Sequence, residues 1–251
     1  MPGIRARALA GLPEVRPGDD LAALILAAAG KSPLRDGMVV SIAHKIVSKS
    51  EGAVVSLADV TPGPRALELA PETGKDPRAV QVILDQSAEL MRAERGVLIC
   101  RTHHGFVCAN AGVDASNVAD PETLVLLPRD PDASARSLRA RLRELTGARL
   151  GILISDSFGR AWRHGQVDLA LGLAGLAPLD DWRGREDSQG LVLAATWLAV
   201  ADAAAATADL ARGKDSREPV VLLEGLDRFV SDEDGPGAAA LVRPPEEDLF
   251  R

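Results

Sequence analysis

The spacing of apolar residues along the chain predicts four helices. Asp19 or Asp20 can cap the first, because a carboxylate just before an apolar stripe accepts hydrogen bonds from the free N–H groups of the first turn. The third is an arginine-rich amphipathic segment, and the fourth is rich in alanine. The segments with helical spacing are residues 17–29, 76–93, 132–145 and 191–212.

Short apolar runs bounded by glycine, proline or polar residues predict strands. Two of these runs flank the sequence Thr-His-His-Gly at 102–105, which indicates a hairpin. The segment 58–77 carries four prolines and is the richest loop candidate. The predicted strands are residues 37–42, 53–57, 96–101, 106–110, 149–154, 167–179 and 219–225.

The order of these elements indicates the fold class. Helices and strands alternate without a regular period, so the class is mixed, α+β or α/β. The sequence has no internal repeat and no long linker. We therefore expect one unit over residues 1–251, either undivided or made of two closely joined subdomains.

The composition excludes several classes of function. Of 251 residues, 46% are hydrophobic, which is enough for a core. The formal net charge is −7 and aromatic residues make up 3%, so neither a basic surface nor a stacking surface for nucleic acid is expected. The most apolar stretch, 191–210, is broken by Asp202 and Asp209, so no membrane span is expected. The N-terminus does not resemble a signal peptide, and two cysteines make no disulfide framework, so the predicted location is the cytoplasm.

Two motifs have suitable residue types but lack the required spacing. Residues 29–32, Ala-Gly-Lys-Ser, end like a phosphate-binding P-loop, but Ile25 stands where that loop needs a glycine. Gly30 is better explained as a helix C-cap. A second group has zinc-ligand types without zinc-finger spacing, so we expect two buried strand residues and an exposed turn. That group is Cys100, His103, His104 and Cys108.

The strongest candidate for chemistry follows the predicted strand 149–154. Asp156 and Ser157 then stand at the carboxyl end of a buried strand, where open sheets bind ligands. Carboxylate and hydroxyl oxygens suit Mg²⁺ or Mn²⁺ held together with phosphates, although an aspartate at such a place can also simply cap a helix. Asp114 lies in a second loop of small and polar residues, where a turn is an equally simple explanation. Two carboxylates about 4 Å apart would repel by roughly 4 kcal/mol, and a divalent cation between them reverses the sign.

Basic side chains provide candidates for anion binding. Lys45 and Lys49 are four residues apart, so they share a face if their segment is helical. Arg160 and Arg163 follow Ser157 and could bind phosphate or carboxylate. The polar run at 182–187 could also bind an anion. Each of these groups could equally be a solvated surface.

Taken together, ordered blocks of the sequence resemble the coenzyme F420-0:L-glutamate ligase family. The resemblance runs from about residue 10 to the tail at 247–250. In bacteria this unit often precedes a flavin-binding reductase-like domain, and here we expect the ligase unit alone. The blocks are residues 11–14, 16–21, 45–52, 104–117, 155–166, 172–176 and 181–184.

The resemblance implies a reaction, its cofactors and an assembly. The reaction is GTP-dependent amide formation between coenzyme F420-0 and L-glutamate, followed by γ-linked addition of further glutamates through an acyl phosphate. The implied cations are Mg²⁺ or Mn²⁺ with a monovalent ion such as K⁺. The implied assembly is an intertwined homodimer with the family's own mixed α/β fold, and neither nucleic acid nor a membrane is an expected partner.

The resemblance also assigns residues by position. The metal ligands that it implies are Asp114, Asp156 and Ser157. The nucleotide contacts that it implies are Leu12, Pro13, Glu14, Val15, His44, Lys49 and Asn117. At 44 the family often has a small polar residue. At 214 archaeal members have an acidic metal-serving residue, whereas this chain has Lys214.

Two other functions remain open on the same residues. One is a metal-dependent phosphohydrolase or phosphotransferase that uses Asp114 and Asp156 without glutamate. The other is a catalytically idle nucleotide-binding protein, for which His44 and Lys214 would be marks of drift.

Overall fold

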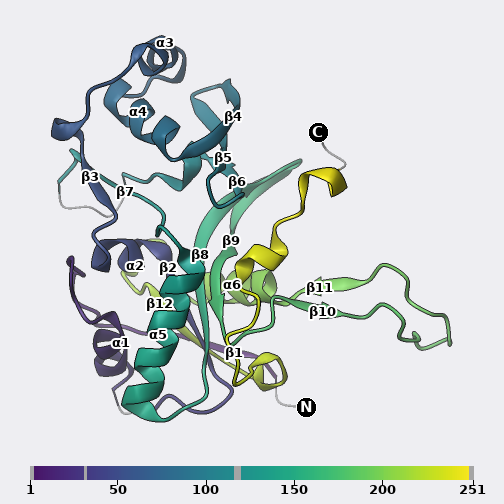
Figure 1. Ribbon diagram of the computed structural model, residues 1–251. Coiled ribbons are helices and arrows are strands. Elements are labelled where there is room, and N and C mark those ends of the chain that lie inside the picture. The colour runs from purple at the N-terminus through teal and green to yellow at the C-terminus, as the bar shows by residue number, and fades with distance from the viewer. Residues whose placement is uncertain (1–2, 31–32, 116–119, 249–251) are drawn as a thin grey trace.

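A five-stranded sheet forms the centre of the computed structural model, which describes residues 3–30, 33–115 and 120–248 (Figure 1). Strands β2 and β8 are parallel, and the other neighbours are antiparallel. The strands, in their order across the sheet, are β1 (Arg5–Ala8), β12 (Val220–Glu224), β2 (Val39–Ala43), β8 (Gly151–Arg160) and β9 (Arg163–Ala174).

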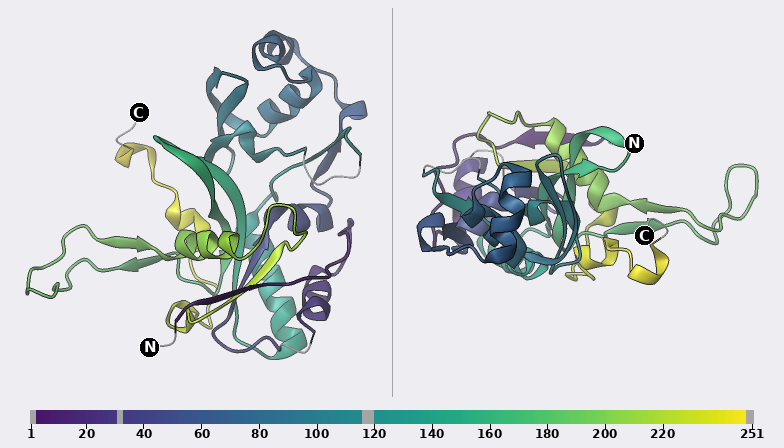
Figure 2. Two further views of the ribbon diagram at one scale, coloured as in Figure 1. Left: turned by 180° about the vertical axis from the view of Figure 1, so that it is seen from behind. Right: turned by 90° about the horizontal axis from the view of Figure 1, so that it is seen from above.

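Helices cover this sheet on both faces. Because side chains alternate along a strand, each strand sends apolar residues to both layers of helices. Val40 and Ile42 of β2 pack with helices on one face, and Val39 packs on the other. The first face is covered by three helices and the second by α6 (Val200–Leu210), with the C-terminal 3₁₀ turns beside it (Figure 2). The three helices are α1 (Leu21–Ala29), α2 (His44–Ser50) and α5 (Pro131–Thr146). The prediction of a mixed α+β class is confirmed.

The ends of the main helices follow from local chemistry. The side chain of Asp20 accepts from the N–H of Ala23 and caps α1, as predicted. Gly30 ends that helix with a positive φ, so it is a C-cap residue rather than part of a phosphate loop. The predicted helix at 191–212 begins only at Val200, because residues before it form strand β11 (Trp197–Ala199).

A smaller lobe packs around its own apolar cluster (Figure 1). It contains α3 (Pro64–Thr73), α4 (Pro77–Asp85) and a sheet of β4 (Ser87–Glu94), β5 (Val97–Thr102) and β6 (Val107–Ala109). The hairpin prediction is confirmed by the pairing of β5 with β6.

Two sequence predictions for this lobe are wrong. The helix predicted over 76–93 stops at Asp85, because the residues after it pair with β5 as strand β4 and gain ladder hydrogen bonds there. The loop predicted over 58–77 contains α3, because Pro64 occupies the first helical turn, where a missing N–H costs nothing.

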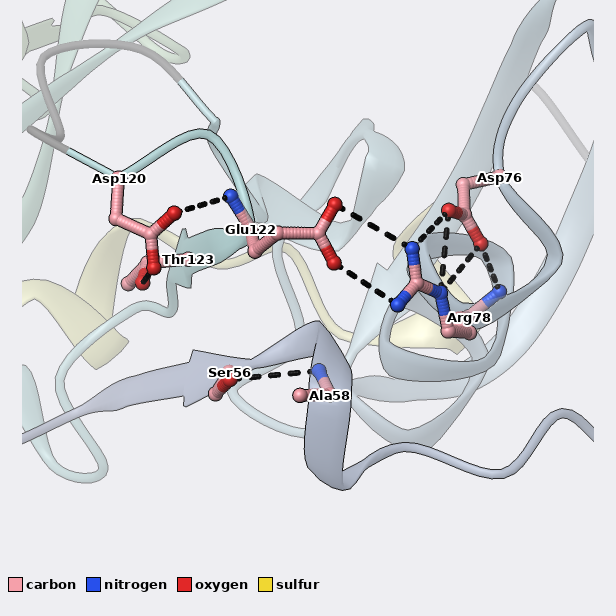
Figure 3. A network of polar contacts seen from close by, with 7 residues as sticks. All are labelled: Ser56, Ala58, Asp76, Arg78, Asp120, Glu122 and Thr123. Atoms are coloured by element: carbon pink, nitrogen blue, oxygen red, sulfur yellow. Dashed lines mark hydrogen bonds and ion pairs between the residues drawn. The ribbon is translucent and has the colours of Figure 1, made fainter.

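An arginine ties the smaller lobe to the strands that join it to the main sheet (Figure 3). These strands are β3 (Val54–Ser56) and β7 (Thr123–Val125). Arg78 donates to Asp76 Oδ2 at 2.7 Å and to Glu122 Oε2 at 2.9 Å. The contact is exposed, so we expect a contribution of no more than about 1 kcal/mol.

A two-stranded arm extends away from the body (Figures 1 and 2). It begins with β10 (Leu179–Asp181) and returns through β11. Leu191, Val192 and Trp197 on the arm are exposed, and the guanidinium of Arg183 lies 4.1 Å from the Trp197 ring centre. Nowhere in the described residues is a helix long and apolar enough to cross a bilayer.

Substitution at Gly172 tests the packing of β9 against α5. A Cβ there would stand 2.3 Å from the carbonyl oxygen of Pro131, so the backbone must shift. We expect Gly172→Ala to lower the free energy of unfolding by about 1–3 kcal/mol in urea denaturation. Gly159→Ala is the matched control, since no heavy atom lies within 4 Å of that Cβ position. Equal losses in the two variants would contradict this packing.

Candidate functional site

A cavity of about 560 Å³ opens where the parallel strand pair ends. The last pair in the ladder of β2 and β8 is Ala43 with Ser155, whereas β8 continues beside β9 to Arg160. The free edge of β8 beyond Ser155 therefore faces the cavity. The prediction that β8 ends before Asp156 is wrong, because β9 keeps pairing with it. The strand that ends there is β2.

Segments from four parts of the chain line this cavity. They are the loop before α1, the junction of β2 with α2, the free edge of β8, and the loop between α6 and β12. The lining residues of these four segments are 12–15, 43–46 with 49, 155–157, and 212–214 with 217–219.

The structure brings most of the predicted site residues together. The cavity wall includes Leu12, Pro13, Glu14, Val15, His44, Lys49, Asp156 and Ser157. Asp114 is not in the wall but contacts it, because its Oδ2 lies 2.5 Å from the Nζ of Lys45. Asn117 lies outside the described residues.

Other candidates from the sequence lie elsewhere. Arg160 and Arg163 stand at the far turn of the β8–β9 hairpin and do not line the cavity. The run 182–187 belongs to the protruding arm, where Arg183 pairs with Asp181 at 2.7 Å. These guanidinium groups are therefore separate from the cavity.

The cysteine and histidine group is structural. Cys100 and Cys108 face each other across β5 and β6, and both are buried free thiols. His103 and His104 bond through Nε2 to the backbone carbonyls of Asp85 and Pro128, at 3.1 and 3.0 Å. The expectation of two buried strand residues beside a turn is confirmed.

Burial makes Asp156 an unusual carboxyl group. Its side chain is 19% exposed, and burial raises the pKa of this carboxyl to about 7. A backbone hydrogen bond at Ser157 and the charge of Lys45 oppose the rise. A carboxylate in this place is therefore costly until a cation reaches it.

His44 presents a neutral ring to the same space. Burial lowers the pKa of His44 to about 3, and the ammonium of Lys45 acts in the same direction. Its Nε2 is 3.5 Å from Asp156 Oδ1, which is too long for a strong hydrogen bond, and the neutral ring makes no salt bridge. Within the described residues this buried Nε2 has no hydrogen-bond partner. A buried polar atom without a partner at a cavity wall indicates a place for a ligand.

A buried carboxylate that the sequence analysis missed lies behind the cavity. Asp168 on β9 is fully buried and forms an ion pair with Arg212. It accepts hydrogen bonds from Ser155 Oγ at 2.9 Å and Ser157 Oγ at 2.7 Å. A single acidic residue within the apolar run of 167–179 was the available signal, because a buried charge needs partners.

Cationic side chains surround the cavity. In the described part of the chain its wall carries Lys45, Lys49, Arg212, Lys214 and Arg217. Some are already bonded to oxygen: Lys49 Nζ lies 2.5 Å from Glu14 Oε1, and Lys214 Nζ lies 2.6 Å from Ser157 Oγ. This arrangement suits a bound polyanion, because several cations converge on a partly enclosed space.

The known proteins described below have sequences similar to this chain. The sequence model of the family described as F420-0:Gamma-glutamyl ligase matches residues 11–225. A relative from Methanothermobacter thermautotrophicus is 45% identical over 252 residues, which cover 99% of both chains. A relative from Methanopyrus kandleri is 46% identical over 240 residues, which cover 95% of this chain and 94% of the relative. One from Methanocaldococcus jannaschii is 43% identical over 220 residues, which cover 87% and 86%. All three are named Coenzyme F420:L-glutamate ligase.

Matches of this extent define the protein as an enzyme of the ligase class, which forms amide bonds. More narrowly, the chain belongs to the F420-0:gamma-glutamyl ligase family. The matched segment, residues 11–225, contains every residue that lines the cavity.

The raised pKa of Asp156 predicts a pH dependence of stability. The folded protein holds this proton up to about pH 7, whereas the ordinary pKa of an aspartate carboxyl is 3.8. Folding therefore takes up a proton between these values, and stability falls as pH rises through that window. In urea denaturation with a chelator, we expect the wild type to lose roughly 2–3 kcal/mol more than Asp156→Asn between pH 5 and 7.5. Equal losses would show that Asp156 titrates normally.

Proposed function

We propose that this enzyme uses GTP to join L-glutamate to coenzyme F420-0 and then adds further glutamates in γ linkage. The names of the relatives support the acceptor and the amino acid. The observation that carries the proposal is the cavity, where cationic side chains line the same wall as the half-buried Asp156 carboxyl. We place the reaction in the cytoplasm, where thiols such as Cys100 and Cys108 stay reduced.

The nucleotide is assigned to this cavity on charge and shape. Lys49 lies on the cavity side of α2 and already binds a carboxylate oxygen of Glu14, so a phosphate oxygen is a reasonable replacement. The loop 12–15 provides a wall of mainly apolar residues next to it. The unpartnered Nε2 of His44 supplies a further polar contact. Asn117, the remaining predicted contact, lies outside the described residues.

The donor set fits a divalent ion that arrives together with a nucleotide. In the described residues no group of three or more acidic, histidine or cysteine side chains converges into a complete metal cage. Mg²⁺ commonly uses one or two carboxylates and fills its remaining positions with phosphate and water. Asp156 would supply one carboxylate, and Asp114, which pairs with Lys45, would supply a second. Ser157, the third predicted ligand, now binds Lys214. When bound, Mg²⁺ or Mn²⁺ would neutralise charge on the phosphates.

The proposed chemistry activates a carboxylate by phosphorylation. The acceptor's carboxylate oxygen attacks the γ-phosphorus of GTP, the bond to the β–γ bridging oxygen breaks, and GDP leaves. The amine of L-glutamate then attacks the acyl carbon, an amide forms, and phosphate departs with a proton lost from nitrogen. The first step brings anion onto anion, so cations must offset the charge. Lys45 and Lys49 are positioned in the wall to do so.

A single assay tests the reaction. We expect incubation with GTP, Mn²⁺, coenzyme F420-0 and L-glutamate to give a product heavier by one or more glutamyl residues, with one GDP for each amide. GDP release at the same rate with and without the acceptor and L-glutamate would identify a phosphohydrolase. Nucleotide binding without any turnover would identify an idle binding protein.

Substitution of Asp156 tests the metal assignment. We expect Asp156→Ala to lower metal-dependent turnover by at least about 100-fold, because the carboxylate that holds the cation is lost. The circular dichroism spectrum should stay unchanged, since this side chain lies at a cavity wall. Asp202→Asn is the control, because Asp202 is a half-buried carboxyl on α6 that does not line the cavity, and this variant should remain active. Near-normal turnover in Asp156→Ala would refute the assignment.

We also propose that the protein is a homodimer that exchanges its arm. The arm from β10 to β11 leaves the body and exposes Leu191, Val192, Trp197 and Leu198, which a second copy could cover. Light scattering should give twice the mass of the 251-residue chain. Shortening the arm by replacing residues 184–193 with a two-residue turn should give a monomer. A monomeric wild type would refute the proposal.

A further inference from the structure

The hydroxyl group of Ser157 can only accept hydrogen bonds from the cavity. Its single proton is committed to Asp168, because Ser157 Oγ donates to Asp168 Oδ1 at 2.7 Å. Asp168 is paired with the guanidinium of Arg212, and a carboxylate in such a pair accepts hydrogen bonds and donates none. The lone pairs of Ser157 Oγ therefore face the cavity, where they can bind only a hydrogen-bond donor or a cation.

A second oxygen converges on the same point. Asp209 lies in the last turn of α6, and its side chain is 18% exposed. The ammonium of Lys214 joins the two groups: its Nζ is 2.6 Å from Ser157 Oγ and 3.3 Å from Asp209 Oδ1. A hydroxyl oxygen and a carboxylate oxygen that both face one point form the kind of oxygen site that hard cations bind.

Asp156 is not part of this group. Side chains alternate along a strand, so Asp156 leaves β8 on the opposite face from Ser155 and Ser157. Its carboxyl lies beside His44 and also interacts with the charge of Lys45, whereas the hydroxyl of Ser157 bonds Asp168 and Lys214. Strand β8 therefore has two positions that can bind a cation: Asp156 on one side, and Ser157 together with Asp209 on the other.

We propose that the ammonium of Lys214 is the resident cation of the site formed by Ser157 and Asp209, in place of a bound metal ion. Ser157 then serves as an acceptor for this ammonium, and a divalent ion is needed only on the Asp156 side. Under this proposal the enzyme needs no potassium at this position. The inference concerns this one cation position, so it can fail while the proposed ligation stands.

Removing the ammonium tests the proposal without nucleotide or divalent metal. Thermal unfolding of the full chain is measured with a chelator, in potassium chloride and in tetramethylammonium chloride of equal ionic strength. We expect the wild type to show the same Tm in both salts. Lys214→Ala opens the site to a small ion, so its Tm should be higher in potassium by about 2–4 °C.

Matched variants separate a specific site from general charge. Lys214→Met fills the space without a charge, so its Tm should not respond to potassium. Arg217→Ala removes a positive charge from the same cavity, and among the described residues Arg217 bonds neither Ser157 nor Asp209, so it also should not respond. An equal potassium effect in the wild type, or none in Lys214→Ala, would overturn the proposal.

Counting bound Mn²⁺ gives a second readout. With a non-hydrolysable GTP analogue, titration followed by electron paramagnetic resonance counts the ions bound per chain. We expect Lys214→Glu to bind one Mn²⁺ more than the wild type, because a carboxylate replaces the ammonium beside Ser157 and Asp209. Two ions in both proteins would mean that Lys214 yields its place to a metal in the wild type, and one ion in both would mean that Ser157 and Asp209 do not form a cation site; either result would overturn the proposal.

Discussion

The site depends on one mismatch in strand length: β2 ends at Ala43 while its parallel partner β8 continues to Arg160. The register of this pair is held by buried residues on both faces: Ile42 and Ile154 pack on one face, and Val39 and Leu153 pack on the other. A shift by one residue would exchange the side chains that β8 presents to these two clusters, so the core disfavours it. The positions of Asp156 and Ser157 at the free edge therefore follow from the packing of the sheet.

Burying the carboxyl groups of Asp156 and Asp168 beside the free edge of β8 costs free energy, which neighbouring charges offset in part. Burial destabilises the ionised form of Asp156, and the lysine on α2 only partly compensates. On the other face of β8, Asp168 is stabilised by Arg212 and two serine hydroxyls. One side of the strand is thus satisfied within the protein, whereas on the Asp156 side the described residues leave the buried Nε2 of His44 without a hydrogen-bond partner. A group with unsatisfied polar needs at a cavity wall is typical of a binding site.

The sequence predicted much of this arrangement and missed parts of it for physical reasons. Periodicity identified α1, α5 and the central strands, because their apolar residues face a continuous core. It failed for β4, where pairing with β5 overrides a helical spacing of apolar residues. The resemblance to a known family named eight residues of the cavity wall, whose individual roles remain predictions. It did not reveal Asp168 or the bond between Lys214 and Ser157, because partners far apart in sequence meet only in the fold.

The central claim is that a divalent cation and the nucleotide phosphates meet at Asp156 in this cavity. Anomalous diffraction from crystals grown with Mn²⁺ and a non-hydrolysable GTP analogue tests it most directly. We predict an anomalous peak within bonding distance of the Asp156 carboxylate, with phosphate density between it and the side chains of Lys45 and Lys49. A Mn²⁺ peak bonded elsewhere, or nucleotide density outside the cavity, would contradict the claim.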